Sequence, residues 1–171
     1  MSPAALPSLS IAVGVVVERR RADSPWVDFI WRGIAVLPDE PSTQPWTVLR
    51  EQDGTTLFYA GSATIDLYPS ETARYRDNLA SGRPSIWVVL SPAEGAWPYA
   101  VTAVTADPAE GEGFTEAADN LVEAVPMPEV LREAIESFVA EHHVEREFVK
   151  RKRRRADPEA LARREHEGGK E

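Results

Sequence analysis

The chain has 171 residues, 43% of them hydrophobic, and its 5 Trp, 5 Phe and 4 Tyr supply enough apolar material for one core. It contains no cysteine, which excludes disulfides, cysteine-ligated zinc or iron–sulfur centres, and thiol catalysis. The formal net charge of −9 is divided unevenly: residues 1–145 carry 9 Lys and Arg against 22 Asp and Glu (−13), whereas residues 146–171 carry 10 against 6 (+4). An acidic body repels polyanions at long range, so this balance disfavours broad coating of nucleic acid.

The N-terminal third has the pattern of two buried strands. Residues 10–18 form a short, β-branched apolar run, and no positively charged region precedes it as in a signal peptide. We therefore expect a cytoplasmic protein. Turn-forming residues at 23–25 separate this run from an aromatic and aliphatic run over 26–37, where Gly33 indicates a bulge or bend.

The middle of the chain continues as strands with one inserted helix. Runs over 46–51 and 55–68 flank Asp53-Gly54, a strong hairpin signal. A helix is predicted over 70–82, with Ser70 as its N-cap and Gly82 as its C-terminal stop. Further strands are predicted over 84–91 and 99–105 and a loop over 107–113, while residues 114–128 fit either a short helix or a turn before a strand.

From Pro128 the hydrophobic period becomes helical. One stripe contains Met127, Leu131, Ala134, Ile135, Phe138 and His142. If the helix continues to Arg155 it is about 42 Å long, and only its first half has enough apolar surface to pack. We therefore expect the second half to project from the domain.

These elements predict an α+β fold. It comprises a small, mainly antiparallel β-barrel or sheet, one short inserted helix, and a long C-terminal helix ending in a basic tail. A closed or half-open barrel packed by a helix is preferred, and a flat antiparallel sheet with helices on one face is the alternative. The predicted division is a β-rich globular domain over 1–145, which includes the packing part of the C-terminal helix, and a basic helical or disordered tail over 146–171.

The sequence carries no recognisable catalytic or cofactor motif. No GxSxG, GxGxxG or Walker sequence occurs, and the first 141 residues contain no histidine. His142 and His143 are adjacent, so on a helix they point about 100° apart and cannot share one metal ion. We therefore expect no catalytic residues, no metal and no cofactor, and the protein is predicted not to be an enzyme.

Two groups of residues are candidates for binding a partner. Trp26 and Trp31 are an odd number of positions apart, so on a regular strand one faces the core and the other can face a partner. The second group combines two apolar anchors with six consecutive cations: Phe148, Val149, Lys150, Arg151, Lys152, Arg153, Arg154 and Arg155. We interpret it as an element that docks on an acidic partner protein.

Other interpretations of the basic run and of the β-domain remain open. The run can be a solvated tail, can dock on the protein's own acidic body, or can contact nucleic acid as part of a regulator. Absence of interleaved aromatics in the run disfavours base stacking. A pocket in the β-domain that binds a small ligand is a further alternative.

Three stretches carry a family resemblance: "VGVVVERRRADSPWVDFIWRGIAVLP" (13–38), "YRDNLASGRPSIWVVLSP" (75–92) and "EHHVEREFVKRKRRRADPEALARRE" (141–165). The chain resembles a proteobacterial family of unknown function whose genes often neighbour those of molybdenum-dependent formate dehydrogenase. The resemblance implies an accessory role in the assembly or maturation of a molybdenum enzyme. Because a persulfide carrier needs a thiol, the lack of cysteine excludes sulfur delivery and favours a non-catalytic binder.

Overall fold

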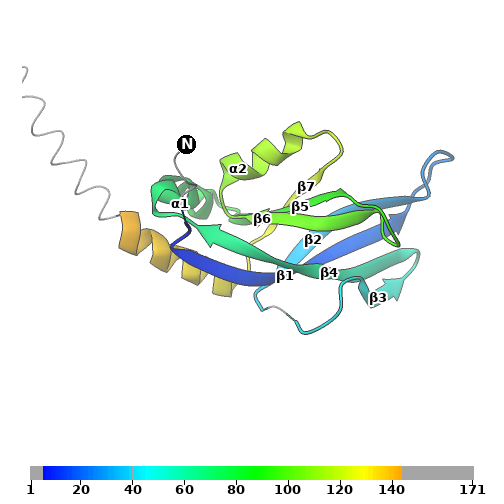
Figure 1. The fold of residues 1–171 in the computed structure, drawn as a ribbon, viewed down its shortest axis with the longest axis horizontal. Coiled ribbons are helices and arrows are strands. Elements are labelled where there is room, and N and C mark those ends of the chain that lie inside the picture. The colour runs from blue at the N-terminus through cyan, green and yellow to red at the C-terminus, as the bar shows by residue number, and fades with distance from the viewer. Residues whose placement is uncertain (1–5, 40, 144–171) are drawn as a thin grey trace, which may run out of the picture.

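The computed structural model describes residues 6–39 and 41–143 (Figure 1). Seven strands and two labelled helices follow in the order β1 (Leu9–Arg21), β2 (Phe29–Leu37), β3 (Thr47–Gln52), β4 (Thr55–Leu67), α1 (Thr72–Ala80), β5 (Ser85–Pro92), β6 (Tyr99–Thr105), α2 (Pro108–Gly113) and β7 (Leu121–Pro126). Short 3₁₀ turns, Pro69–Glu71 and Phe114–Glu116, precede α1 and follow α2. A last helix begins at Glu129 and is described as far as His143.

The strands form two antiparallel sheets, with strand orders β2-β1-β4-β3 and β6-β5-β7. β2 lies beside β7 and β4 lies beside β6, so the two sheets face each other around one core. A Cβ atom on Gly33 of β2 would lie 2.9 Å from Val88 Cγ1 of β5, which shows how closely the sheets approach. The predicted α+β class is confirmed. The preferred closed barrel is not formed, because the strands are hydrogen-bonded into two sheets with core side chains between them.

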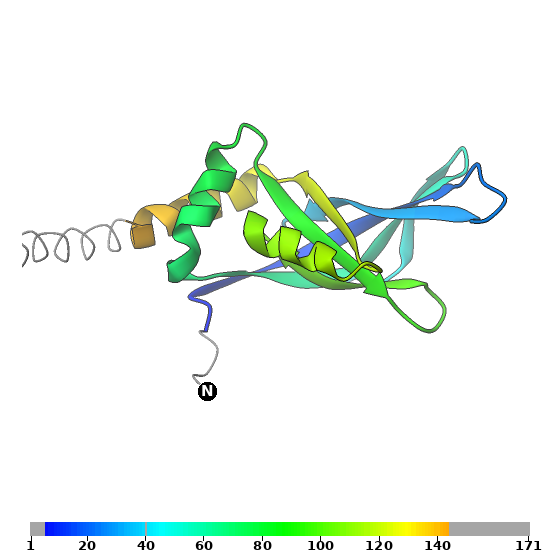
Figure 2. The same cartoon turned by 90° about the horizontal axis from the view of Figure 1, so that it is seen from above.

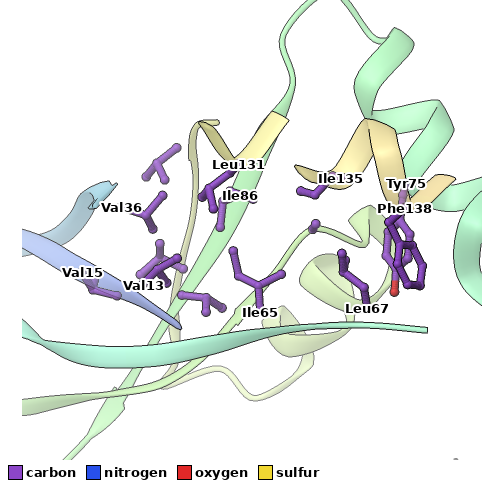
Figure 3. Close-up of a cluster of buried hydrophobic side chains, with 14 of the residues drawn as sticks. Val13, Val15, Val36, Ile65, Leu67, Tyr75, Ile86, Leu131, Ile135 and Phe138 are labelled. Atoms are coloured by element: carbon purple, nitrogen blue, oxygen red, sulfur yellow. The ribbon is translucent and has the colours of Figure 1, made fainter. Parts of the chain in front are cut away.

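The core is filled by the inward-facing positions of both sheets and by the last helix. Val13, Val15 and Val17 of β1 are fully buried, as the period of two in a strand requires. The last helix contributes Leu131, Ile135 and Phe138, and Figure 3 shows the Phe138 ring next to that of Tyr75, at 6.2 Å between centroids. This confirms the predicted helical stripe, and the His142 ring continues it at 4.3 Å from Phe138.

Two local predictions are wrong. Residues 107–113 contain a helix rather than only a loop, because the carboxylate of Asp107 accepts hydrogen bonds from the N–H groups of Ala109 and Glu110 and caps α2. Ser70 is not an N-cap: it lies within the 3₁₀ turn, and α1 begins at Thr72 with no side-chain cap. Gly82, at φ +84°, does follow the end of α1 as predicted.

The last helix lies at one end of the molecule, and the tips of the β1–β2 and β3–β4 hairpins lie at the other (Figures 1 and 2). The helix begins directly after Pro128, as predicted. Its predicted continuation to Arg155, and the basic tail, lie outside the described residues.

Candidate protein-binding site

The two hairpin tips form one projecting unit, which we call the distal arm (residues 18–32 and 47–57). The tips are joined because the N–H of Arg21 donates a hydrogen bond of 3.1 Å to the carbonyl of Gly54. Asp53 and Gly54 have φ angles of 52° and 80°, the left-handed pair that a tight hairpin turn uses, so the predicted turn is confirmed. Figure 2 shows both hairpins extending away from α1 and the last helix.

The distal arm exposes large apolar side chains. Trp26 is 89% exposed, and four others are about half exposed: Val27, Ile30, Val48 and Leu49. Trp26 lies in the turn before β2 rather than in a strand, and its backbone N–H donates a hydrogen bond to the Ser24 hydroxyl. The prediction from strand alternation, that one of Trp26 and Trp31 faces the core and the other a partner, therefore does not apply to Trp26. Its side chain is nevertheless exposed to solvent.

Trp31 lies at the centre of an aromatic cluster beneath the exposed residues. Its ring contacts those of Phe29, Trp46, Phe58, Trp97 and Tyr99, with centroids 5.9 to 6.5 Å apart. Trp46 has a φ of 68°, which is uncommon for a non-glycine residue, and its backbone N–H donates a hydrogen bond to the Tyr59 carbonyl. The cluster joins the β1–β2 hairpin to the β5–β6 loop, so Trp31 packs within the domain. Trp46 and Trp97 were not predicted as partners of Trp31, because only the three-dimensional fold brings them together.

Arg19 occupies the same cluster. Its guanidinium lies 4.5 Å from the Phe29 centroid, 5.1 Å from Phe58 and 5.6 Å from Trp31, distances at which a cation is attracted to the ring face. Its Nη2 lies 3.5 Å from the Thr56 hydroxyl, and Nε is buried without a hydrogen-bond partner. Stacking on three rings fixes this side chain, so the arm is a rigid platform under its exposed residues.

The outer face of the four-stranded sheet is hollowed at the arm. A basin of about 330 Å³ is lined by residues from all four strands and the β3–β4 turn: Glu18, Ile34, Arg50, Gln52, Asp53, Thr55 and Leu57. Ile34 and Leu57 supply apolar surface between charged and polar side chains. No sequence pattern indicated this basin, because its lining residues come from separate strands.

A second hollow of about 310 Å³ lies between β4 and β6 and includes Asp66 and Glu110. Burial raises the pKa of Glu110 above its ordinary value; a hydrogen bond from Thr105 opposes the rise, and the charge of Asp107 adds to it. Folding therefore shifts the equilibrium of the Glu110 carboxyl toward its protonated form relative to the unfolded chain.

We expect Glu110→Gln to stabilise the protein at neutral pH. A carboxyl whose pKa is raised on folding contributes stability below its unfolded pKa and loses it as the pH rises through the folded pKa. The difference in free energy of unfolding between variant and wild type should therefore be small at pH 4 and grow toward pH 7. Urea unfolding at several pH values measures it; a difference that is constant across this range would contradict the assignment.

Residues 6–39 and 41–143 contain no group of three or more His, Asp or Glu side chains arranged to hold a metal ion. His143 lies in this part of the chain. Its Nε2 accepts a hydrogen bond of 2.9 Å from Nη1 of Arg76, because a guanidinium can only donate.

Within the described chain, no helix has the length and apolar character needed to cross a membrane.

Residues 12–153 match the family described as "Protein of unknown function (DUF3305)". The chain belongs to the DUF3305 family. No curated protein and no solved structure matches the chain. The DUF3305 match includes the whole distal arm and most of the basic run. Phe148 to Arg155 lie outside the described residues.

Proposed function

We propose that this DUF3305 protein is a non-catalytic accessory factor that binds a partner protein through its distal arm. The observation that carries the proposal is the 89% exposure of Trp26 at the tip of a hairpin fixed by an aromatic cluster. A Trp on a rigid support can bury its large apolar surface in a partner with little loss of conformational entropy, and Trp is enriched among the residues that dominate binding energy.

We further propose that the partner is a molybdenum-dependent formate dehydrogenase or part of its maturation machinery. The support is the family resemblance of the three stretches quoted above, together with the absence of cysteine, which leaves binding rather than sulfur transfer as the contribution of this chain. Phe148 to Arg155 would provide a second contact with the same assembly.

The direct test is co-purification from cells that produce the formate dehydrogenase. We expect the wild-type chain to recover the enzyme or one of its maturation proteins, and Trp26→Ser to lower the affinity at least about tenfold, since loss of an interface Trp commonly exceeds 1.4 kcal/mol. The same substitution should change the free energy of unfolding by less than about 0.5 kcal/mol, because the ring is exposed.

Val130→Ser is the matched control, because Val130 is 62% exposed on the last helix, away from the arm. It should bind as the wild type does. Truncation after Val149 tests the basic run separately. Equal recovery with wild type and Trp26→Ser would contradict the role of the arm, and recovery of neither formate dehydrogenase nor its maturation proteins by the wild type would contradict the proposed partner.

A further inference from the structure

We propose that the six consecutive cations of the basic run (residues 150–155) dock in the chain's own hollow between β4 and β6 when no partner is bound. We call this cavity of about 310 Å³ the acidic hollow. The contact goes beyond the function proposed above and does not depend on it, because it forms within one free molecule.

The lining of the acidic hollow carries negative charge and no cation. Its carboxylates are Asp66 of β4 and Glu110 of α2. Hydroxyl groups in the same lining belong to Ser62, Thr64, Tyr68 and Thr102. Three other hollows formed by described residues each include at least one arginine side chain. The charge of the lining therefore favours a cationic occupant at this hollow.

The surface around the acidic hollow is acidic as well. Residues 84–131, which include β5, β6, α2 and β7, contain 8 Asp or Glu and no Lys or Arg. Burial and then the charges of Asp107, Asp66 and Glu71 raise the pKa of Glu110. Arg74 does not line the hollow, and it is already paired with Glu71 and Asp107, 3.1 Å from each. A cation placed in the hollow relieves the repulsion among these carboxylates.

The end of the last helix lies near the acidic hollow, with α1 between them (Figures 1 and 2). Nη1 of Arg76 on α1 is 2.9 Å from Nε2 of His143, while Nη1 of Arg74 is 3.1 Å from Oδ2 of Asp107, which begins α2. A helix with its side chains is about 10–12 Å across. Positions 150 and 155 follow His143 by 7 and 12 residues, and an extended chain of these lengths spans about 25 and 42 Å. The basic run is therefore long enough to reach the hollow.

Two other arrangements of the basic run are less favourable. A second copy would have to approach against the repulsion between two bodies whose residues 1–145 each carry −13, whereas a tethered segment has an effective concentration on the order of millimolar. The distal arm lies at the opposite end of the molecule, and its 5 Arg balance its 5 Asp or Glu. A partner that binds the basic run must then displace it from the acidic hollow.

The experiment uses the full chain in the absence of any partner. Because the chain has no cysteine, Ala156→Cys allows one nitroxide label beside the basic run without removing a cation. Nuclear magnetic resonance measures the paramagnetic broadening of backbone amides. We expect strong broadening at Thr64 and Thr102 of the hollow and none at Trp26 or Asp53 of the distal arm. Added salt should weaken the broadening, because it screens the attraction between the charges.

Matched charge variants test whether the carboxylates hold the basic run. Asp66→Asn combined with Glu110→Gln should reduce the broadening at the hollow at least about threefold, since each exposed ion pair contributes up to about 1 kcal/mol. Glu51→Gln combined with Asp53→Asn changes the net charge equally on the distal arm and should leave the broadening unchanged. The amide spectrum of each variant shows whether it is folded.

Three results would overturn the inference: no broadening at the hollow, equal broadening at the hollow and the distal arm, or equal losses in the two double variants. A mixture of isotope-labelled chains without nitroxide and unlabelled chains with it tests for a second copy. Broadening at the hollow in this mixture would show a contact between molecules and refute the internal one. The partner of the distal arm is tested separately by the co-purification described above, so either proposal can fail without the other.

Discussion

Replacing Ile135 with alanine should lower the free energy of unfolding by about 3 kcal/mol, within the range of about 2–5 for such buried truncations. Ile135 is fully buried and belongs to the core cluster that joins the last helix to both sheets. The substitution removes apolar burial and leaves a cavity between the helix and the strands. Urea unfolding followed by circular dichroism gives the free energy and the slope with denaturant.

A graded series separates loss of core packing from loss of helix propensity. Ile135→Val should cost about 1 kcal/mol, since it removes one methylene, and Val130→Ala on the exposed face of the same helix should change stability by less than about 0.5 kcal/mol. If Ile135→Ala were no more destabilising than Val130→Ala, the described packing of the last helix would be wrong.

Asn78→Ala is expected to have a similar effect through hydrogen bonds. The Asn78 side chain is buried; its Nδ2 donates to the carbonyls of Ser85 (2.8 Å) and Ala106 (3.0 Å), and its Oδ1 accepts from the N–H of Ser85 (3.0 Å). Alanine leaves these three backbone groups without their partner. At about 1 kcal/mol for each bond, the free energy of unfolding should fall by about 3 kcal/mol.

The neighbouring residue supplies the control. Asp77 is exposed on the same turn of α1, and Asp77→Ala should stay within about 0.5 kcal/mol of the wild type. Hydrogen exchange of the Ser85 amide adds a local measurement, because this amide loses its acceptor in Asn78→Ala. Unchanged protection at Ser85 together with unchanged stability would show that Asn78 does not connect α1 to β5.

Much of the fold follows from local sequence signals. The β-branched apolar run of β1, the Asp53-Gly54 turn and the stripe from Leu131 to Phe138 each determine an element through neighbouring residues, and the structure confirms all three. α2 was missed because Gly111 and Gly113 suggested a loop. In the structure Gly111 is needed where α2 crosses β5: an added Cβ would collide with the Trp87 ring.

The candidate site was less predictable because it depends on contacts between distant strands. Trp26 was a candidate because of its odd spacing from Trp31 on a predicted strand, whereas its exposure results from its place in a turn. The aromatic cluster unites Trp31 with Trp46 and Trp97, which are 15 and 66 positions later in the chain. The basin depends on the strand register that brings residues of β1, β2, β3 and β4 together, and a single sequence does not specify that register.

The position of the last helix has a practical and mechanistic consequence. Because the last helix and the hairpin tips lie at opposite ends of the molecule, a fluorophore attached to the described part of that helix would lie away from a protein bound at the tips. The same polarity allows one molecule to engage two proteins simultaneously without a steric clash between them. A bridging molecule of this kind would raise their effective concentration toward each other, even if each individual contact were weak.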